Sequence, residues 1–171
     1  MEILSFDLTG KFAHFRKYYT NNTALSFTIP PRTTLMGIVG ALLGRPRDQY
    51  YEEFSSDKLR FGIQVKSNIK KSIHRINYLK VESDRDFRGR NQHVQTPVEV
   101  ITGNDLTKEN VCYRIYISYF GKDNQTFQEL KEVLSKGQFN YQLSLGPANF
   151  TASIERVRYF EDIKIETEEI S

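Results

Sequence analysis

The chain has 171 residues, 39% of them hydrophobic and 13% aromatic, which is enough for the core of one folded domain and more than a disordered chain carries. No stretch approaches the roughly 20 apolar residues of a membrane span, the first residues do not resemble a secretory leader, and the single cysteine, Cys112, lacks zinc-site spacing to other ligands. We therefore expect a cytoplasmic protein with no membrane span, disulfide, metal or cofactor.

The net charge of +3 is spread unevenly along the chain. Residues 1–57 are neutral, residues 58–95 carry +7, and residues 96–171 carry −4. Clustered lysines and arginines release counterions from a phosphate backbone, the source of most sequence-independent affinity for nucleic acids. The middle segment therefore predicts an anionic partner, and a solvated basic face without a partner is the alternative.

The first third of the chain predicts a strand, a helix and a second strand. Residues 4–9 alternate apolar and polar side chains, typical of a strand buried on one face, and Gly10 ends it. After a pair of prolines, apolar residues recur at helical spacing over 35–42, and Gly44 marks the end of that helix. Residues 59–65 alternate again and predict the second strand.

The alternation loosens over residues 67–103, where a polar, arginine-rich stretch separates two apolar runs. We interpret this segment as an inserted hairpin with a mobile basic tip. A strand over 111–120 follows, and then a helix that Thr126 and Glu129 mark by the spacing of a capping box.

A closing strand falls within residues 150–165. The order of elements predicts an α+β, ferredoxin-like βαββαβ domain of the kind used by RNA-recognition motifs. We expect one domain over residues 1–165, with the hairpin inserted at about 67–103 and an acidic tail at 166–171.

Three groups of residues are candidates for binding RNA. Cations and rings interleave after the first strand, a helix N-terminus offers unpaired N–H groups, and cations with amides fill the insertion. The candidates are His14, Arg16, Lys17, Arg32, Thr33, Thr34, Lys70, Lys71, Arg75, Arg85, Arg88, Arg90, Gln92, His93 and Gln95. The alternative interpretations are helix capping by Thr33 or Thr34 and burial of some of the rings in the core.

No catalytic residue is assigned. The three histidines, His14, His74 and His93, are the groups that a metal-independent ribonuclease would use as acid or base. The sequence lacks the motifs of nucleotide hydrolysis, hydride transfer, serine hydrolysis and zinc proteolysis. A ribonuclease is therefore the only enzyme class kept as an alternative.

Five segments resemble one family in their sequence and order. They are FDLTGKFAHFRK at 6–17, PPRTTLMGIVGALLG at 30–44, HVQTPVEV at 93–100, YRIYI at 113–117 and LGPANFTASIE at 145–155. Together they resemble the Cas-five family of the CRISPR-associated RAMP superfamily, in a type I-B-like form. The glycine-rich loop of that superfamily departs here, because Pro147 and Ala148 follow Gly146. Many relatives also continue into further C-terminal strands.

The resemblance implies a RAMP fold in which the inserted β-hairpin is a thumb. It implies a non-catalytic, RNA-binding subunit of a type I surveillance complex (Cascade) that caps the 5′ handle of the CRISPR RNA (crRNA) in antiviral defence. The implied partners are crRNA, the Cas-seven backbone and the large subunit. A pre-crRNA endoribonuclease and a protein-docking scaffold are the alternatives.

Overall fold

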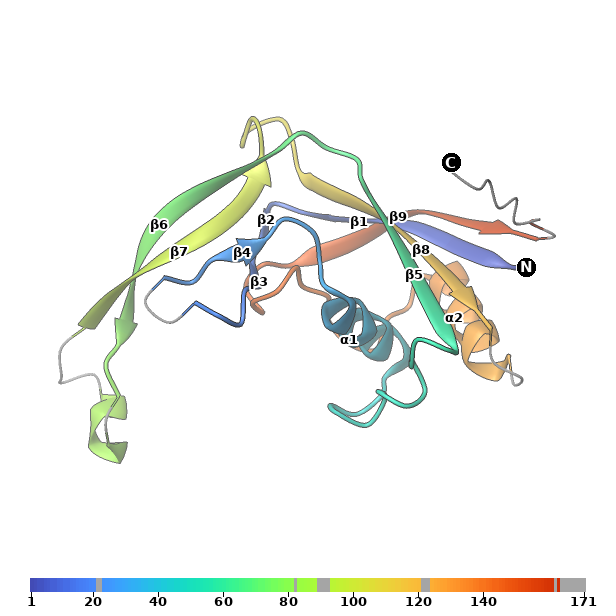
Figure 1. Ribbon diagram of the computed structural model, residues 1–171, viewed down its shortest axis with the longest axis horizontal. Coiled ribbons are helices and arrows are strands. Elements are labelled where there is room, and N and C mark those ends of the chain that lie inside the picture. The colour runs from blue at the N-terminus through green and yellow to red at the C-terminus, as the bar shows by residue number, and fades with distance from the viewer. Residues whose placement is uncertain (21–22, 82, 89–92, 121–123, 162, 164–171) are drawn as a thin grey trace, which may run out of the picture.

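A computed structural model describes residues 1–171 except 21–22, 82, 89–92, 121–123, 162 and 164–171 (Figure 1). The predicted tail at 166–171 thus lies outside the described residues. The elements are β1 (Ile3–Gly10), β2 (Phe12–Ala13), β3 (Phe15–Arg16), β4 (Ser26–Phe27), α1 (Arg32–Leu43), β5 (Leu59–Val65), β6 (Ile69–Leu79), a 3₁₀ turn (Asp84–Arg88), β7 (His93–Gly103), β8 (Val111–Tyr119), α2 (Gln125–Lys136) and β9 (Ala152–Phe160).

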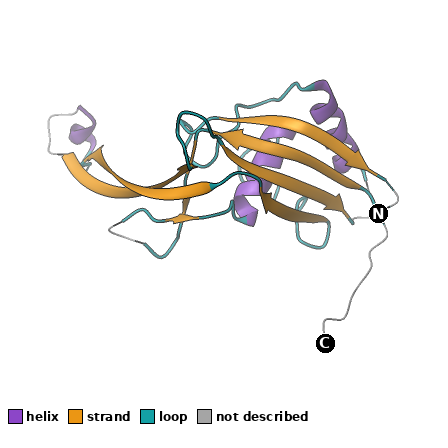
Figure 2. Ribbon diagram, turned by 90° about the horizontal axis from the view of Figure 1, so that it is seen from above, coloured by secondary structure: helices purple, strands orange, loops and turns teal. Residues whose placement is uncertain are grey.

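The main sheet has four antiparallel strands in the order β5-β8-β1-β9. Both helices lie against one face of this sheet (Figure 1), and the opposite face carries neither of them (Figure 2). The first and third strands of the motif are central and the second and fourth are at the edges, which is the ferredoxin-like order. The predicted α+β, ferredoxin-like fold is confirmed.

The expectation that the first strand is buried on one face only is wrong. Ser5 and Asp7, the polar side chains of β1, are each only 1% exposed. β1 is flanked by β8 on one side and β9 on the other, so side chains of both neighbours cover its polar face. Arg114 of β8 shields Asp7 with two hydrogen bonds, at 2.6 and 2.9 Å.

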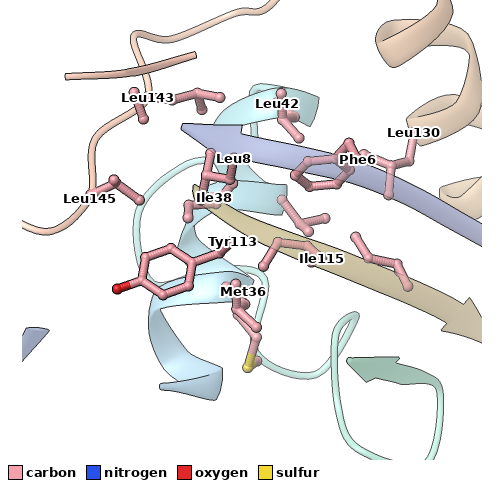
Figure 3. Packing of buried hydrophobic residues seen from close by; sticks show 14 of the residues in the cluster. Phe6, Leu8, Met36, Ile38, Leu42, Tyr113, Ile115, Leu130, Leu143 and Leu145 are labelled. Carbon is pink, nitrogen blue, oxygen red and sulfur yellow. The ribbon is translucent and has the colours of Figure 1, made fainter. Parts of the chain in front are cut away.

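The core lies between the sheet and the helices. Phe6 and Leu8 of β1 and Ile115 of β8 meet apolar side chains of both helices, Leu42 and Leu130 among them (Figure 3). α1 ends at Gly44, as predicted, and this residue adopts the left-handed conformation. Small residues in α1 serve packing, because a Cβ at Gly40 would lie 2.9 Å from the Tyr50 ring. Within the described residues, neither helix is long and apolar enough to cross a membrane.

The second helix exists as predicted, but its capping box does not. Asn124 is the N-cap and its side chain makes no capping hydrogen bond. Thr126 already lies inside the helix and donates to Glu53 Oε1 at 2.8 Å. Glu129 instead accepts a 2.7 Å hydrogen bond from Arg45, which also binds Glu53. Tertiary contacts with the loop after α1 have thus replaced the local motif.

The predicted insertion is a two-stranded ribbon formed by β6 and β7, which pair without interruption from Ile69–Gly103 to Leu79–His93. The ribbon extends away from the main sheet (Figure 1). Its strands are longer than the apolar runs of the sequence suggest, because polar residues also join the ladder. A small cluster anchors it, with Val98 and Val100 packed on Ala24.

Candidate nucleic-acid interface

The candidate residues of the ribbon are divided between its two faces. Directly opposed residues of an antiparallel ladder point to the same face, and successive residues alternate. By this register one face carries Lys71, Arg75, His93 and Gln95, and the other carries Lys70. The candidate lysines at 70 and 71 therefore cannot contact the same phosphate-bearing surface.

Lys71 is held by the junction between the ribbon and the body. Its Nζ donates to the Ser26 carbonyl at 2.6 Å and lies 3.2 Å from Glu99 Oε2. The Ser26 N–H also donates to Glu99, at 2.8 Å. Burial alone would raise the pKa of Glu99, but the Ser26 hydrogen bond and Lys71 together lower it below its ordinary value. The charge of Lys71 is thus compensated within the chain.

His14 is also an internal contact of this junction. It is 7% exposed, and its Nδ1 lies 2.7 Å from the carbonyl oxygen of Glu99, so that nitrogen carries the donated proton. Its backbone N–H donates to Leu145 O at 2.9 Å. A Cβ at Gly146, where φ is +107°, would collide with the His14 carbonyl. Glycine is therefore needed at position 146 because the His14 carbonyl packs against it, which is a structural role.

The start of α1 is built into the body as well. Arg32 donates from Nη2 to the carbonyls of Phe54 and Leu59 at 2.7 and 2.8 Å, and its guanidinium lies 5.1 Å from the Phe61 ring centroid. The N-cap is Pro31, and no side chain caps the helix, so neither Thr33 nor Thr34 does. Thr33 is exposed and Thr34 half-buried.

A loop beside the ribbon presents exposed rings together with cations. This aromatic loop, residues 17–20 and 23–25, is joined to β7 at Ala24, whose N–H donates to Pro97 O at 2.8 Å and whose carbonyl accepts from the Glu99 N–H at 2.9 Å. Tyr18 is 88% and Tyr19 59% exposed, and their ring centroids are 5.2 Å apart at 90°. Lys17 Nζ lies 5.8 Å from the Tyr19 centroid. Such rings are suited to stacking single-stranded bases.

Several candidates remain exposed and uncompensated around this loop and on the outer ribbon. Within the described part of the chain, Arg16, Arg75, Arg88 and His93 are exposed and belong to no ion pair. Gln95 is exposed beside them, and Lys70 donates to Asn104 O at 2.8 Å. The Arg85 side chain, Arg90 and Gln92 lie outside the described residues.

The three histidines do not converge on one site. His14 is buried, and the exposed His74 contacts Ser72 Oγ at 2.8 Å through Nε2. His74 and His93 lie on opposite faces of the ribbon by register. Across the residues that the structure describes, no three His, Cys, Asp or Glu side chains gather as metal ligands would.

The sequence indicated that rings after the first strand could stack bases, but the candidate residues included none of these rings. Tyr18, Tyr19 and Tyr78, the last 50% exposed on the ribbon, are exposed as base-stacking residues are. In the sequence an exposed tyrosine resembles the buried Tyr113. The signal in the sequence was the interleaving of rings and cations after the first strand, which includes Tyr18 and Tyr19.

Over residues 3–169 the sequence matches the model of a protein family described as CRISPR-associated protein (Cas_Cas5). None of the curated proteins matches the chain in sequence.

Several solved structures share the fold. A chain of a CRISPR RNA-guided surveillance complex has a TM-score of 0.61 at 14% identity, covering 88% of this chain and 60% of that one. A Cas protein gives 0.54 at 15% identity, covering 86% and 58%. A CRISPR protein from Archaeoglobus fulgidus gives 0.53 at 12%, covering 93% and 62%. The chain thus spans about 60% of the length of these proteins.

Proposed function

The chain belongs to the CRISPR-associated Cas5 family, and from that premise we propose that it is a non-catalytic, cytoplasmic subunit of a type I CRISPR surveillance complex that binds the 5′ handle of crRNA. One observation carries the proposal. An exposed tyrosine pair lies in a loop that runs along a ribbon with uncompensated cations. Rings that stack bases beside cations that meet phosphates are the two components of single-strand binding.

The proposed RNA surface is smaller than the set of sequence candidates. It consists of Arg16, Lys17, Tyr18, Tyr19, Arg75, Arg88, His93 and Gln95. Arg32, Lys71 and His14 are left out because their polar groups are engaged inside the chain. RNA bound here would lie along the ribbon and the aromatic loop, away from the N-terminus of α1.

Binding of handle RNA by the purified chain tests the proposal. Replacing Tyr18 and Tyr19 together by Ser should weaken binding by about 10-fold or more, because loss of base stacking costs roughly 1–3 kcal/mol per base. Arg75→Gln should make the slope of log K against log salt concentration shallower by about 0.7, the value for loss of one phosphate contact. Fluorescence anisotropy at several salt concentrations measures both.

Arg47→Gln is the matched control for charge. The Arg47 side chain is 92% exposed between α1 and β5, so its loss removes one charge from the body without touching the ribbon. If it weakens binding as much as Arg75→Gln does, the affinity comes from net charge and the proposed surface is wrong. Incubating handle-containing repeat RNA in EDTA tests the ribonuclease alternative, because cleavage abolished by a single His→Ala change would replace the binding role.

We also propose that the chain assembles with the Cas-seven backbone and the large subunit. Phe87 is 70% exposed in the 3₁₀ turn at the outer end of the ribbon, and Ile73 is 62% exposed on β6. Exposed apolar side chains on a projecting element are accessible for contacts with another protein. Phe87→Ser should reduce co-purification with these subunits, whereas Tyr51→Ser, at a position 46% exposed on the body, should not.

A further inference from the structure

The face of the main sheet without helices carries its own set of cations and rings. The register aligns Gln64, Arg114, Asp7 and Glu155 in one row across the four strands. The next row has Gly62, Tyr116, Ser5 and Arg158, and the one after it Arg60, Ser118, Ile3 and Phe160. Figure 2 shows this face turned toward the viewer, with the ribbon extending beyond one end.

A slot of about 350 Å³ opens on this face near the edge strand β5. It is lined by Met1, Ile3, Arg60, Phe61, Gly62, Tyr116, Ile117, Ser118 and Phe120. The Arg60 guanidinium lies 4.1 Å from the Phe120 ring centroid, and Gly62 has no side chain to fill the space beside Tyr116. The slot is thus lined by the rings of Tyr116 and Phe120, by the Arg60 guanidinium and by the backbone at Gly62.

The face that contains the slot carries a net positive charge. Arg114 and Asp7 neutralise each other through hydrogen bonds of 2.6 and 2.9 Å, so this pair adds no net charge. Four more cations share the face: Arg60, Lys66, Arg156 and Arg158. Glu155 is the acidic group of the same face, and it accepts a hydrogen bond from Thr9 at 3.3 Å.

Of the two arginines of β9, Arg156 pairs with Asp7 and Arg158 remains available. Arg156 occupies a break in the β1–β9 register with φ of 52°; its side chain is 65% exposed, and Nη1 lies 3.6 Å from Asp7. Arg158 is exposed and, among the described residues, has no carboxylate partner. Arg158 and Tyr116 are two strands apart in one row, which is about 10 Å.

We propose that this face is a second binding site for single-stranded nucleic acid, with one base stacked in the slot against Tyr116 and Phe120 and neighbouring phosphates on Arg60 and Arg158. Charge complementarity favours this ligand, because cations spread over several strands meet successive phosphates of a strand. The slot lies at the Ile3 end of β1, whereas the ribbon pairs with β2, beyond Gly10. Eight residues of strand, about 26 Å, separate the two ends, so this site is distinct from the handle surface.

Photocrosslinking locates the proposed contact without relying on affinity. Single-stranded RNA and DNA of the same mixed sequence, each carrying 4-thiouridine or 4-thiothymidine, are irradiated with the full chain, and tryptic peptides are identified by mass spectrometry. We expect a crosslink in the peptide 115–122, which contains Tyr116 and Phe120. The same crosslink should persist when Tyr18 and Tyr19 are both Ser, so failure of the handle surface and failure of this site are distinguishable.

Substitutions at the slot test its contribution to affinity. In the Tyr18→Ser, Tyr19→Ser background, Tyr116→Leu should weaken binding of the oligonucleotide by about 5-fold or more through lost stacking. Arg158→Gln should reduce the salt dependence of log K by about 0.7, and Arg47→Gln should leave both quantities unchanged. Circular dichroism melting confirms that each variant is folded.

Two results would overturn the proposal. One is the absence of any crosslink in 115–122 under conditions in which the aromatic loop of the wild-type chain crosslinks. The other is protection of this peptide from hydrogen exchange by polyglutamate but not by either oligonucleotide, which would make the face a docking site for an acidic protein. Equal crosslinking of RNA and DNA supports it, because stacking and phosphate contacts do not distinguish the sugars.

Discussion

The four-stranded body and the ribbon are stabilised in different ways. β1 is buried from Leu4 to Gly10 and lies between two strands and two helices, whereas no residue of β6 is fully buried. In β7, the buried residues are those near the body, from Val98 onward. The body is thus held by apolar burial, and the outer ribbon mainly by its backbone ladder. We therefore expect truncation of a side chain in the body to lower the free energy of unfolding. Truncation of a candidate contact in the outer ribbon should instead weaken RNA binding.

The largest expected effect is in the core of the body. Phe6 is 1% exposed and packs among side chains of both helices, so Phe6→Ala should lower the free energy of unfolding by about 3–5 kcal/mol. Ile73→Ala, at a position 62% exposed on the ribbon, should change it by less than about 0.5 kcal/mol. Urea denaturation measures both. A comparable loss in the two variants would show that the ribbon contributes to the same core.

The next largest effect concerns the buried ion pair of the body. Asp7 is 1% exposed and the Arg114 side chain 14%, so Asp7→Asn leaves a nearly buried guanidinium without its counterion. We expect a loss of about 3 kcal/mol in the free energy of unfolding. Glu132→Gln is the control, because it breaks an exposed pair with Lys136 on α2 whose loss should cost less than about 0.5 kcal/mol. Equal effects would mean that Asp7 is hydrated.

The same carboxyl should make the body sensitive to acid. The hydrogen bonds and charge of Arg114 hold the pKa of Asp7 below its ordinary value, although burial opposes this shift. A group with a lowered native pKa stabilises the fold above its unfolded pKa, and this contribution disappears as pH falls through the native value. Stability should therefore be steady down to about pH 5 and decline below about pH 4. Asp7→Asn should flatten that decline; an unchanged acid profile would contradict the assignment.

The two regions also differ in how well the sequence predicted them. Alternation identified β5 and β8, and helical spacing with Gly44 identified α1, because these patterns follow directly from packing on one sheet. The sequence did not predict the burial of Ser5 and Asp7, because this burial requires β9 to pair along the second edge of β1. The predicted capping box also failed because of long-range contacts, since Thr126 binds Glu53 and Glu129 binds Arg45.

At the candidate site, composition located the ribbon but could not separate available cations from engaged ones. Arg75 and Lys71 look alike in the sequence, yet Lys71 is held by Ser26 and Glu99, which lie far from it in the chain. Arg158 and Tyr116 were missed because the strand register alone places them in one row. Long-range pairing decides which charges face a ligand.

Glu99 joins the two regions, and its substitution should change stability less than the substitutions of Phe6 and Asp7. Its carboxylate binds Ser26 and Lys71, and its backbone binds Ala24 and His14. Glu99→Gln keeps an oxygen that accepts from the Ser26 N–H but loses the ion pair, so the free energy of unfolding should fall by only about 1 kcal/mol.

The effect of this change should be concentrated at the junction. Hydrogen exchange at the amide of Lys17, which donates to Leu25 O, should accelerate, while amides of β1 and β8 keep their protection. Lys71→Met should produce the same local change, and the double variant little more, because both substitutions remove one interaction. If Glu99→Gln instead accelerated exchange throughout the body, ribbon and body would unfold as one unit, and the contrast between burial and ladder would no longer hold.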